Sequence, residues 1–482
     1  MDERSDMRTG LAVEDALSIE QHGFDYIPES ERYLRPKALF PFWVGANAYL
    51  YYVFIGGLLV FLGLSLWQAT LAIVLGIAGF VFVAYGSVTG ARSGLPTLTL
   101  TRAAFGVRGN AFNSFLAWLE LIAFEALNAV FGVFATLALF AELGWDDPGD
   151  GGTVLATILV IGASALVAIY GHRLLFLSQK IFAISLTSIL ALVAILTLDE
   201  VDWSHTASVS GSSAFGLFLV AMALVVAAPL SYFATCADYP RYLPGDTSAR
   251  SVTWYTFAGA AVIILPLTFL GAALATTIDM SDPVAALDPL VPGWLFIVYA
   301  IAAAGGAIAN NAITFYSSGL TIQSIGVPVK RWVATAIDCV LSTLVVLYIL
   351  LINEDFYTTT SNFLPILNCW IGPFGAIMIA DGVLRRFRYD PVAAHTFTPM
   401  SAYWYQGGFN VRGLISLGVG IVVGFLTVNA PDLQGPISKV LFDGDLSWIA
   451  PPIAAALCYW IIARRPAPTA PEAMPESRQV TG

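Results

Sequence analysis

Charged side chains are scarce in this sequence. They make up 11 % of the 482 residues, whereas hydrophobic residues make up 57 %. A water-soluble domain carries about 25 % charged residues, so this composition excludes a protein whose surface mainly faces water. Most of the outer surface must instead face lipid. The apolar runs are long and unbroken, which indicates membrane-spanning helices and excludes the short alternating strands of a membrane β-barrel.

Motifs for metal, redox and nucleotide chemistry are also missing. The four cysteines form no Cys-x-x-Cys pair, and no Gly-x-x-x-x-Gly-Lys loop occurs. All four histidines fall in predicted tails or loops, which argues against a histidine proton relay within the membrane. The N-terminus, MDERSDMRTG, lacks the apolar stretch of a cleaved signal peptide. We therefore expect no cofactor, no bound metal, no ATP-driven transport by this chain and no nucleic-acid partner.

The sequence contains many apolar segments that are long enough to span a membrane. A helix needs about 20 apolar residues to cross a bilayer, and about twelve such segments follow one another. We place them at residues 38–62, 68–88, 112–141, 153–170, 175–197, 213–235, 253–276, 292–320, 332–352, 362–384, 412–429 and 446–463. The predicted fold class is an all-α integral membrane protein with about 12 transmembrane helices.

The distribution of Lys and Arg predicts the orientation. With the N-terminus inside, all but Lys439 of the 22 basic residues fall in the tails, in cytoplasmic loops or at the adjoining helix ends. The predicted outer loops are acidic instead, with Asp146, Asp147 and Asp199 among their residues. Basic residues are enriched in cytoplasmic loops of membrane proteins. We expect a multi-pass protein of the cytoplasmic (plasma or inner) membrane, surrounded by lipid, with both termini inside.

Two of the segments carry interruptions. The first reads FPFWVGANAYLYYVFIGGLL and contains Gly45 and Asn47, while the sixth reads LVVAAPLSYFATCADYPRYLP and contains Pro229, which lacks a backbone donor. The two lie five segments apart, so they occupy corresponding positions if segments 1–5 and 6–10 form an inverted repeat. Broken helices in such positions mark the binding site of many transporters. The alternative is that Gly and Pro merely kink these helices.

The third segment, FNSFLAWLELIAFEALNAVFGVF, carries two acids, Glu120 and Glu125. An acid at the centre of the bilayer costs roughly 3 kcal/mol or more, which indicates function. Glu125 and Asn128 share a helix face, and Phe124 is adjacent to it, so these three side chains are suited to a flat polar heterocycle. The alternative for Glu125 is a protonated or paired structural acid. Glu120 lies off that face and nearer the inner end of the segment, where a structural or gating role explains it at least as well as substrate binding.

The eighth and ninth segments add further polar residues. The eighth reads YAIAAAGGAIANNAITFYSSGLTIQ, in which Asn310 and Asn311 must find partners if they are buried. Gly305 and Gly306 permit close approach of another helix. The asparagines either bind a solute or join helices. Asp338, alone in the ninth segment, either carries a proton or pairs with a neighbour.

Several longer motifs resemble one known family, in the same order along the chain. They are FWVGANAYLYYVFIGGLLVFLGLSLWQA, SGLPTLTLTRAAFGVRGN, SYFATCADYPRYLP, ANNAITFYSSGL, ADGVLRRFRYD and YWYQGGFN. The chain resembles the nucleobase–cation symport family, which comprises purine and cytosine permeases with hydantoin and allantoin relatives. The resemblance extends from about residue 25 to residue 463.

The resemblance implies a five-plus-five inverted repeat with broken helices 1 and 6, and alternating access to a site at mid-membrane. The domains expected on this basis are a cytosolic tail (1–36), a ten-helix transport core (37–384), two additional C-terminal helices (385–463) and a disordered cytosolic tail (464–482). The positions that match the family's substrate-binding residues are Asn47, Phe124 (where tryptophan is frequent), Asn128, Tyr232 or, in another register, Pro229, and Asn311.

The eighth segment departs from the sodium-coupled members of that family. Those members have hydroxyl side chains five and six residues before the segment-eight asparagine, where this chain has Gly306 and Gly305. A hard cation prefers oxygen ligands, and glycine supplies only its carbonyl. We therefore expect proton coupling rather than a sodium site, with Glu125 and Asp338 as candidate carriers.

The resulting hypothesis is a secondary active symporter that imports a small planar heterocycle, a nucleobase such as cytosine or a purine, together with a proton. Allantoin, a hydantoin or a vitamin-like heterocycle are alternative substrates. An amino-acid or osmolyte carrier of the same architecture would need a carboxylate-binding helix end. A channel would show uncoupled flux, and an intramembrane enzyme would need a nucleophile or a metal set.

Overall fold

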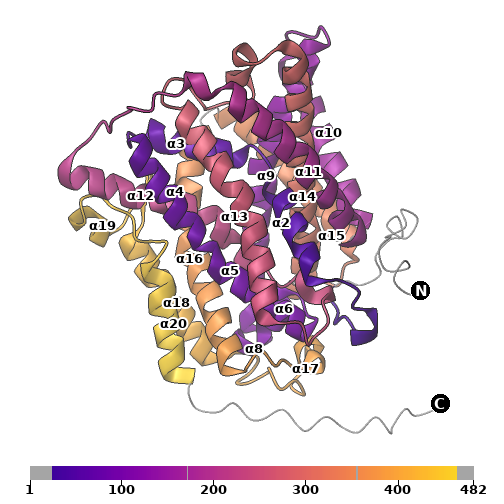
Figure 1. Cartoon of the computed structure of the whole chain (residues 1–482). Helices are drawn as coiled ribbons and strands as arrows, with labels where there is room; N and C mark the ends of the chain where they lie inside the picture. Colours follow the sequence, from indigo (N-terminus) through magenta and orange to yellow (C-terminus); the bar gives the residue numbers. More distant parts are fainter. Residues whose placement is uncertain (1–23, 171, 354–355, 464–482) are drawn as a thin grey trace, which may run out of the picture.

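The computed structural model describes residues 24–463 except 171 and 354–355, and these residues form a helical bundle (Figure 1). Residues 1–23 and 464–482, which were assigned to the two tails, lie outside the described residues. The first half comprises η2 (Glu29–Glu31), η3 (Pro36–Ala38), α2 (Leu39–Asn47), α3 (Tyr51–Phe61), α4 (Leu66–Ala78), α5 (Phe80–Gly86), α6 (Val88–Ser93), α7 (Thr97–Leu100), α8 (Arg102–Phe105), α9 (Gly109–Glu142), α10 (Gly149–Tyr170), α11 (His172–Leu196) and η4 (Leu198–Glu200).

The second half contains more helices and one short hairpin. Its elements are α12 (Gly211–Ser231), η5 (Tyr232–Ala234), η6 (Pro240–Tyr242), α13 (Ala249–Leu274), η7 (Ala285–Leu290), α14 (Gly293–Ile325), α15 (Arg331–Tyr348), η8 (Ile349–Asn353), α16 (Phe356–Leu384), α17 (Pro391–His395), α18 (Val411–Thr427), β1 (Asn429–Ala430), β2 (Leu433–Gln434), α19 (Pro436–Val440) and α20 (Ala450–Ala463). The two strands are antiparallel, with Asn429 opposite Gln434.

The helices have the length and composition of membrane spans. In the part of the chain that the structure describes, nine helices pass this test, and the bent pair α2–α3 makes a tenth. Two shorter apolar helices, α18 and α20, follow. Large apolar side chains such as Trp67, Phe82 and Trp254 are mostly exposed on the outside of the bundle, as expected of a surface in contact with lipid. The predicted all-α membrane architecture is confirmed, and each predicted apolar segment overlaps one of these helices.

The packing of the first ten segments follows a repeat of five. Helices α2 and α3 (segment one) pack against α13 (segment seven), and α12 (segment six) correspondingly packs against α4 (segment two). In the same way, α2 packs against α11 as α12 packs against α16. Helices α9 and α14, the third members of the two repeats, pack against each other. Because each repeat has an odd number of spans, the second crosses the membrane in the opposite direction, so the repeat is inverted.

The first segment is broken after Asn47. Helices α2 and α3 meet at 56°, and Ala48 leaves the helical conformation with ψ 73°. The short side chain of Asn47 stabilises this break, because its Nδ2 donates to the Trp43 carbonyl at 2.8 Å and its Oδ1 accepts from the Tyr52 hydroxyl at 2.7 Å. Gly45 allows close contact with α11, since a Cβ there would lie 2.2 Å from the carbonyl oxygen of Gln179.

The sixth segment loses its α-helical form shortly after a proline. Pro229 lies inside α12, which ends two residues later at Ser231, because proline removes a backbone donor and crowds the preceding turn. The chain continues as the single 3₁₀ turn η5 and then as irregular turns up to η6. Both predicted interruptions are therefore present, one in each repeat.

One end of the bundle, which we call the basic end, carries α6, α8 and α17 (Figure 1). Residues 24–35, predicted as part of a tail, pack against this end. The amide of Ile27 donates to the Gly94 carbonyl at 3.0 Å, and the Arg32 guanidinium donates to Ala91 at 3.1 Å. Arg102, also buried at this end, donates to Ser324 at 3.0 Å. The C-terminal helices join the core here, since the Tyr459 hydroxyl of α20 donates to Asp381 of α16 at 2.7 Å.

Candidate functional site

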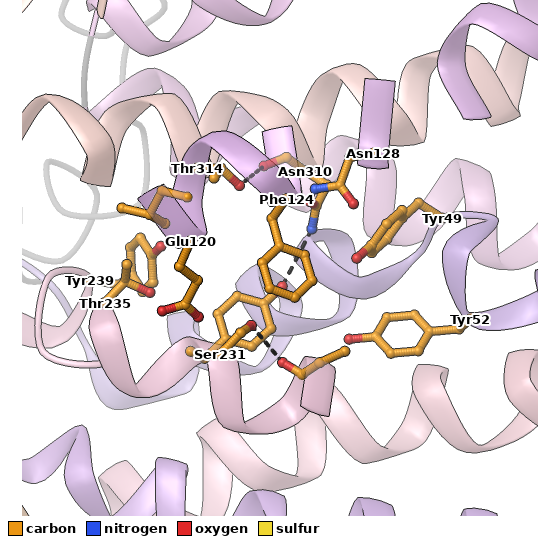
Figure 2. A pocket seen from close by; sticks show the side chains of 13 residues that line it. Tyr49, Tyr52, Glu120, Phe124, Asn128, Ser231, Thr235, Tyr239, Asn310 and Thr314 are labelled. Atoms are coloured by element: carbon orange, nitrogen blue, oxygen red, sulfur yellow. Dashed lines mark hydrogen bonds between the residues drawn. The ribbon is translucent and has the colours of Figure 1, made fainter. Parts of the chain in front are cut away.

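A cavity lies in the core, where the two broken segments meet α9 and α14 (Figure 2). The cavity is small in this conformation, with a volume of about 30 Å³. Its walls are formed by Tyr49, Tyr52, Glu120, Leu121, Phe124, Asn128, Ala228, Ser231, Tyr232, Thr235, Tyr239, Asn310 and Thr314. Tyr49 and Tyr52 lie at one end of the cavity and Thr235 and Tyr239 at the other, with Phe124 between them. Irregular backbone at this depth is tolerated where it lines a cavity.

Helix α9 contributes a stripe of three side chains to this cavity. Glu120, Phe124 and Asn128 are spaced four residues apart, so they project from one helix face. The ring of Phe124 is supported by Phe363, whose ring centroid lies 5.4 Å away in an edge-on arrangement. An aromatic plane is therefore flanked by a carboxyl group on one side and by an amide on the other.

A relay of amides connects this stripe to the break in the first segment. Asn310 Nδ2 donates to the Ala46 carbonyl at 2.5 Å, and Asn128 Nδ2 donates to Asn310 Oδ1 at 2.5 Å. A backbone carbonyl can only accept, so the amide of Asn310 must present its nitrogen to Ala46 and its oxygen to Asn128. The carbonyl oxygen of the Asn128 side chain is then left buried without a hydrogen-bond partner in the protein. The broken first segment thus fixes the orientation of the Asn310 amide, and through it leaves Asn128 Oδ1 as a hydrogen-bond acceptor in the cavity wall.

Asn47 acts on the cavity through its neighbours. It does not line the cavity itself, but its Oδ1 accepts hydrogen bonds from two cavity tyrosines, Tyr52 at 2.7 Å and Tyr232 at 3.3 Å. Tyr232 also accepts from Asn310 Nδ2 at 3.3 Å. Of the two registers considered for the segment-six aromatic, both Tyr232 and Pro229 lie at the break, and Tyr232 is the one that lines the cavity.

Glu125 and Asn311 do not line the cavity, in contrast to the sequence-based expectation. Glu125 follows Phe124 by one residue, which turns it about 100° around the helix toward α15. There the Ser342 hydroxyl donates to Glu125 Oε2 at 2.5 Å. Asn311 is turned away from the cavity by the same rotation and donates to the backbone carbonyl of Glu125 at 3.0 Å. The cavity positions on these helices are held by Glu120 and Asn310 instead.

The two predicted coupling residues belong to one buried cluster. Asp338 and Ser342 are one turn apart on α15, and Ser342 bonds Glu125, so both carboxyl groups face the interface of α9 and α15. Trp118 of α9 donates its Nε1 to Asp338 Oδ1 at 2.6 Å. Glu125 and Asp338 are both fully buried, and neither has a basic partner among the bonds that the structure shows.

Sequence reasoning did not place Glu120, Asn310, Tyr49, Tyr52 and Tyr239 in the cavity wall. Glu120 was assigned a structural or gating role because it lies off the face shared by Glu125 and Asn128. The informative signal was its spacing of four from Phe124 and of eight from Asn128, which indicates a single stripe. Tyr49 and Tyr52 reach the cavity because the chain bends between α2 and α3, and no periodicity reveals the direction of such a bend.

Below the cavity, the basic end is closed by a network of polar bonds. Asp238 accepts from the Thr97 amide at 2.8 Å and from its hydroxyl at 2.9 Å. Burial raises the pKa of Asp238 to about 6, although these bonds and Arg241 favour the charged form. Tyr239, a cavity residue, is bonded to Ser317 of α14 at 3.1 Å. The irregular chain after α12 is thereby fixed to both repeats.

Comparison with known proteins places the whole core in one family. Residues 26–450 match the family described as permeases for cytosine/purines, uracil, thiamine and allantoin. A putative purine-cytosine permease of Bacillus subtilis (strain 168), YxlA, is 27 % identical over 458 residues, which cover 93 % of this chain and 96 % of the relative. The cytosine permease of Escherichia coli (strain K12) is 27 % identical over 403 residues, which cover 80 % and 85 % of the two chains.

Solved structures agree with this assignment at the level of the fold. The transporter Mhp1 of the nucleobase-cation-symport-1 family, in a closed conformation with bromovinylhydantoin bound, superimposes with a TM-score of 0.72 at 19 % identity. The match covers 93 % of this chain and 96 % of Mhp1. The resemblance inferred from the sequence motifs is confirmed, and the protein is a multi-pass membrane permease rather than an enzyme. The chain belongs to the family of permeases for cytosine and purines, uracil, thiamine and allantoin.

Proposed function

We propose that this permease imports a small planar heterocycle, a free nucleobase such as cytosine or a purine, by alternating access in symport with a proton. The observation that carries the proposal is the cavity between the two breaks, where Phe124 offers a ring face between polar groups. Stacking of a base on an aromatic ring contributes roughly 1–3 kcal/mol. The names of the relatives support the same class of substrate.

The charge of the cavity argues against carriers of amino acids and other carboxylates. Among the described residues that line it, none is basic and one, Glu120, is acidic. A carboxylate solute would leave water without finding a cation to pair with in this cavity, which is costly. A neutral heterocycle with several hydrogen-bonding groups fits this wall, which combines hydroxyl, amide and carboxyl groups with aromatic rings.

The break in the first segment supports coupling without sodium. Carbonyl groups exposed by broken helices are the usual ligands for sodium in transporters of this design. Here two carbonyls of α2, those of Trp43 and Ala46, accept hydrogen bonds from the side-chain amides of Asn47 and Asn310. Gly305 and Gly306 add no side-chain oxygen nearby on α14. These amide donors take over the role that a cation would have at the break.

The proposed proton site is the cluster of Glu125, Asp338 and Ser342 between α9 and α15. Two buried carboxyl groups without a basic partner cannot both be ionised at low cost, so the pair holds a proton readily. The cluster also reaches the cavity wall, because Asn311 is bonded to the backbone of Glu125 and adjoins Asn310. Protonation at α15 can therefore bias how α9 and α14 pack around the solute.

The basic end is proposed to face the cytoplasm, with both termini inside. Three arginines are buried at that end, namely Arg32, Arg102 and Arg241. Cytoplasmic loops of membrane proteins are enriched in arginine and lysine. Under this orientation, the network around Asp238 closes the cytoplasmic side of the cavity.

The test is a binding panel on the purified full-length protein. Thermal unfolding would be followed with cytosine, adenine, hypoxanthine, uracil, allantoin, a hydantoin, thiamine and pyridoxine, each with and without sodium and at several pH values. We expect stabilisation by a free nucleobase that is independent of sodium. Stabilisation by allantoin, a hydantoin or a vitamin alone would transfer the substrate assignment to that compound, and a sodium requirement would remove the proton assignment.

A further inference from the structure

Glu120 has no role in the coupling scheme, although it is the most unusual group in the cavity. Its side chain is buried, with 3 % of the residue exposed, and neither carboxyl oxygen has a hydrogen-bond partner in the protein. Figure 2 shows its carboxyl group extending into the cavity below Phe124, toward the end that holds Thr235 and Tyr239. A buried polar group without partners destabilises a fold. Such a group in a binding cavity is explained by a ligand that supplies the missing bonds.

We propose that Glu120 is a specificity-determining residue that binds one edge of the substrate in its neutral, protonated form. The inference rests on the proposed function and adds a recognition rule to it. An ionised carboxylate without a partner in the membrane interior is much more costly than the neutral acid. A neutral carboxyl group presents an O–H donor beside a carbonyl acceptor. It is complementary to a heterocycle edge on which an acceptor and an N–H donor are adjacent, such as the ring nitrogen and the exocyclic amine of cytosine or adenine.

Asn128, at the opposite end of the three-residue stripe on α9, adds a second requirement for the substrate. Asn128 lies eight residues from Glu120, about 12 Å along the helix, with Phe124 between them. Its Nδ2 is bonded to Asn310, so its free Oδ1 can only accept. A solute stacked on Phe124 therefore needs an N–H donor at the end near Asn128. Free bases carry such a ring N–H, whereas nucleosides and bases alkylated at that nitrogen do not.

Among the described residues that line the cavity, Glu120 is the only carboxyl group, and no histidine, cysteine or basic side chain lies beside it. The titratable neighbours that line the cavity are Tyr49 and Tyr52 from the first break and Tyr232 and Tyr239 from the sixth segment, and tyrosines ionise near pH 10. Helix α14 contributes Thr314 and Asn310. Toward the basic end, Asp238 is bonded to Thr97, and Arg241 donates to the Tyr316 hydroxyl at 2.8 Å. Glu125 faces α15 instead.

The experiment measures equilibrium binding of paired probes to the purified full-length protein. The probes are cytosine with N4,N4-dimethylcytosine, and adenine with its N6,N6-dimethyl derivative, because dimethylation removes the donors that Glu120 would bind. In Glu120→Ala, we expect the affinity for the better parent base to fall about tenfold or more, and the preference over the dimethyl analogue to disappear. Glu120→Gln keeps a donor and an acceptor, so its affinity should stay within about threefold of wild type. Glu142→Gln, at the exposed end of α9, is the control.

The outcomes separate this inference from the proposed function. If the wild type binds neither cytosine nor adenine, the assignment to these bases fails first. If it binds one of them and Glu120→Ala retains both the affinity and the preference for the parent base, the role of Glu120 is refuted and the function stands. If Glu120→Ala does not fold, the pH dependence decides. Wild-type affinity should fall as the pH is raised and Glu120 loses its proton, and an equal fall in Glu120→Gln would overturn the proposal.

Discussion

Glu120 and Glu125 stand five residues apart on α9, and their carboxyl groups have opposite surroundings. Glu120 extends into the cavity without a protein partner, whereas Glu125 is bonded to Ser342 and lies one helical turn from the level of Asp338. Five residues correspond to a rotation of about 140° around a helix. One helix therefore serves two interfaces, and the proposed function assigns solute recognition and proton coupling to separate acids.

Helix α14 is divided in the same way. Asn310 lines the cavity and fixes the break in the first segment, while its neighbour Asn311 is bonded to the backbone of Glu125. Two pairs of residues, Glu120 with Glu125 on α9 and Asn310 with Asn311 on α14, are thus divided between the same two sides. The two helices occupy equivalent positions in the two repeats and pack against each other. On each helix, one member of the pair lines the cavity and the other lies on the side of Glu125 and Ser342.

The largest expected effect comes from Glu125, the proposed coupling acid. Glu125→Gln keeps the size of the side chain but cannot carry a proton, so we expect accumulation driven by a pH gradient to fall at least about tenfold. Solute exchange without a gradient should persist, because the cavity is unchanged. Both are measured in proteoliposomes with radiolabelled base. If this variant accumulates the base as well as the wild type does, Glu125 does not couple transport to the proton, and the proposed division of roles between Glu120 and Glu125 is wrong.

The second-largest effect is expected at Phe124, whose ring lies between Glu120 and Asn128 in the cavity wall. Phe124→Ala removes the stacking surface, and we expect the affinity for the base to fall about tenfold, in line with roughly 1–3 kcal/mol for a stacked base. Phe124→Trp should retain binding, and Phe115→Ala, on the outer side of α9, is the matched control. Isothermal titration provides the measurement. An unchanged affinity in Phe124→Ala would show that the solute does not stack on this helix.

A smaller effect is expected from the partner of Glu125. Asp338→Asn leaves an acceptor for Trp118 but removes the neighbouring acid, so Glu125 should hold its proton less tightly. We expect half-maximal uptake to move toward lower pH by about one unit, with solute affinity unaltered. The pH profile of uptake is the readout. A shift of solute affinity instead would connect this cluster to the cavity rather than to coupling.

The smallest effect is expected at Tyr232, a tyrosine of the cavity wall. Tyr232→Phe removes a hydroxyl whose bonds to Asn47 and Asn310 are both long, at 3.3 Å. Long hydrogen bonds are weak, and we expect the affinity for the base to change by less than about threefold. Tyr52→Phe, which loses a 2.7 Å bond to Asn47, should have the larger effect of the two in the same titration. The reverse order would assign Tyr232 a direct contact with the solute.

The sequence predicted the helices well and the site in part. Each long apolar run became a helix, because backbone groups in lipid have no other way to be satisfied. Asn47 and Pro229 marked both interruptions, since each disturbs a helix by local chemistry. Phe124, Asn128 and Tyr232 line the cavity as expected. The sequence reasoning chose Glu125 for the site, whereas the structure places Glu120 in the cavity wall and Glu125 against Ser342 of α15.

The sequence by itself determined that this chain crosses a membrane many times, where its helices lie and where two of them break, because these features follow from local hydrophobicity and from the backbone chemistry of a few residues. Only the tertiary structure decided which face of α9 and of α14 borders the cavity. Rotation about a helix axis is set by contacts with distant segments, here the bonds of Asn310 to Ala46 and of Ser342 to Glu125. Both helices turn apolar side chains outward, such as Phe115 of α9 and Ile301 of α14, and apolar side chains inward as well. Polarity therefore does not distinguish their faces clearly enough to predict that rotation.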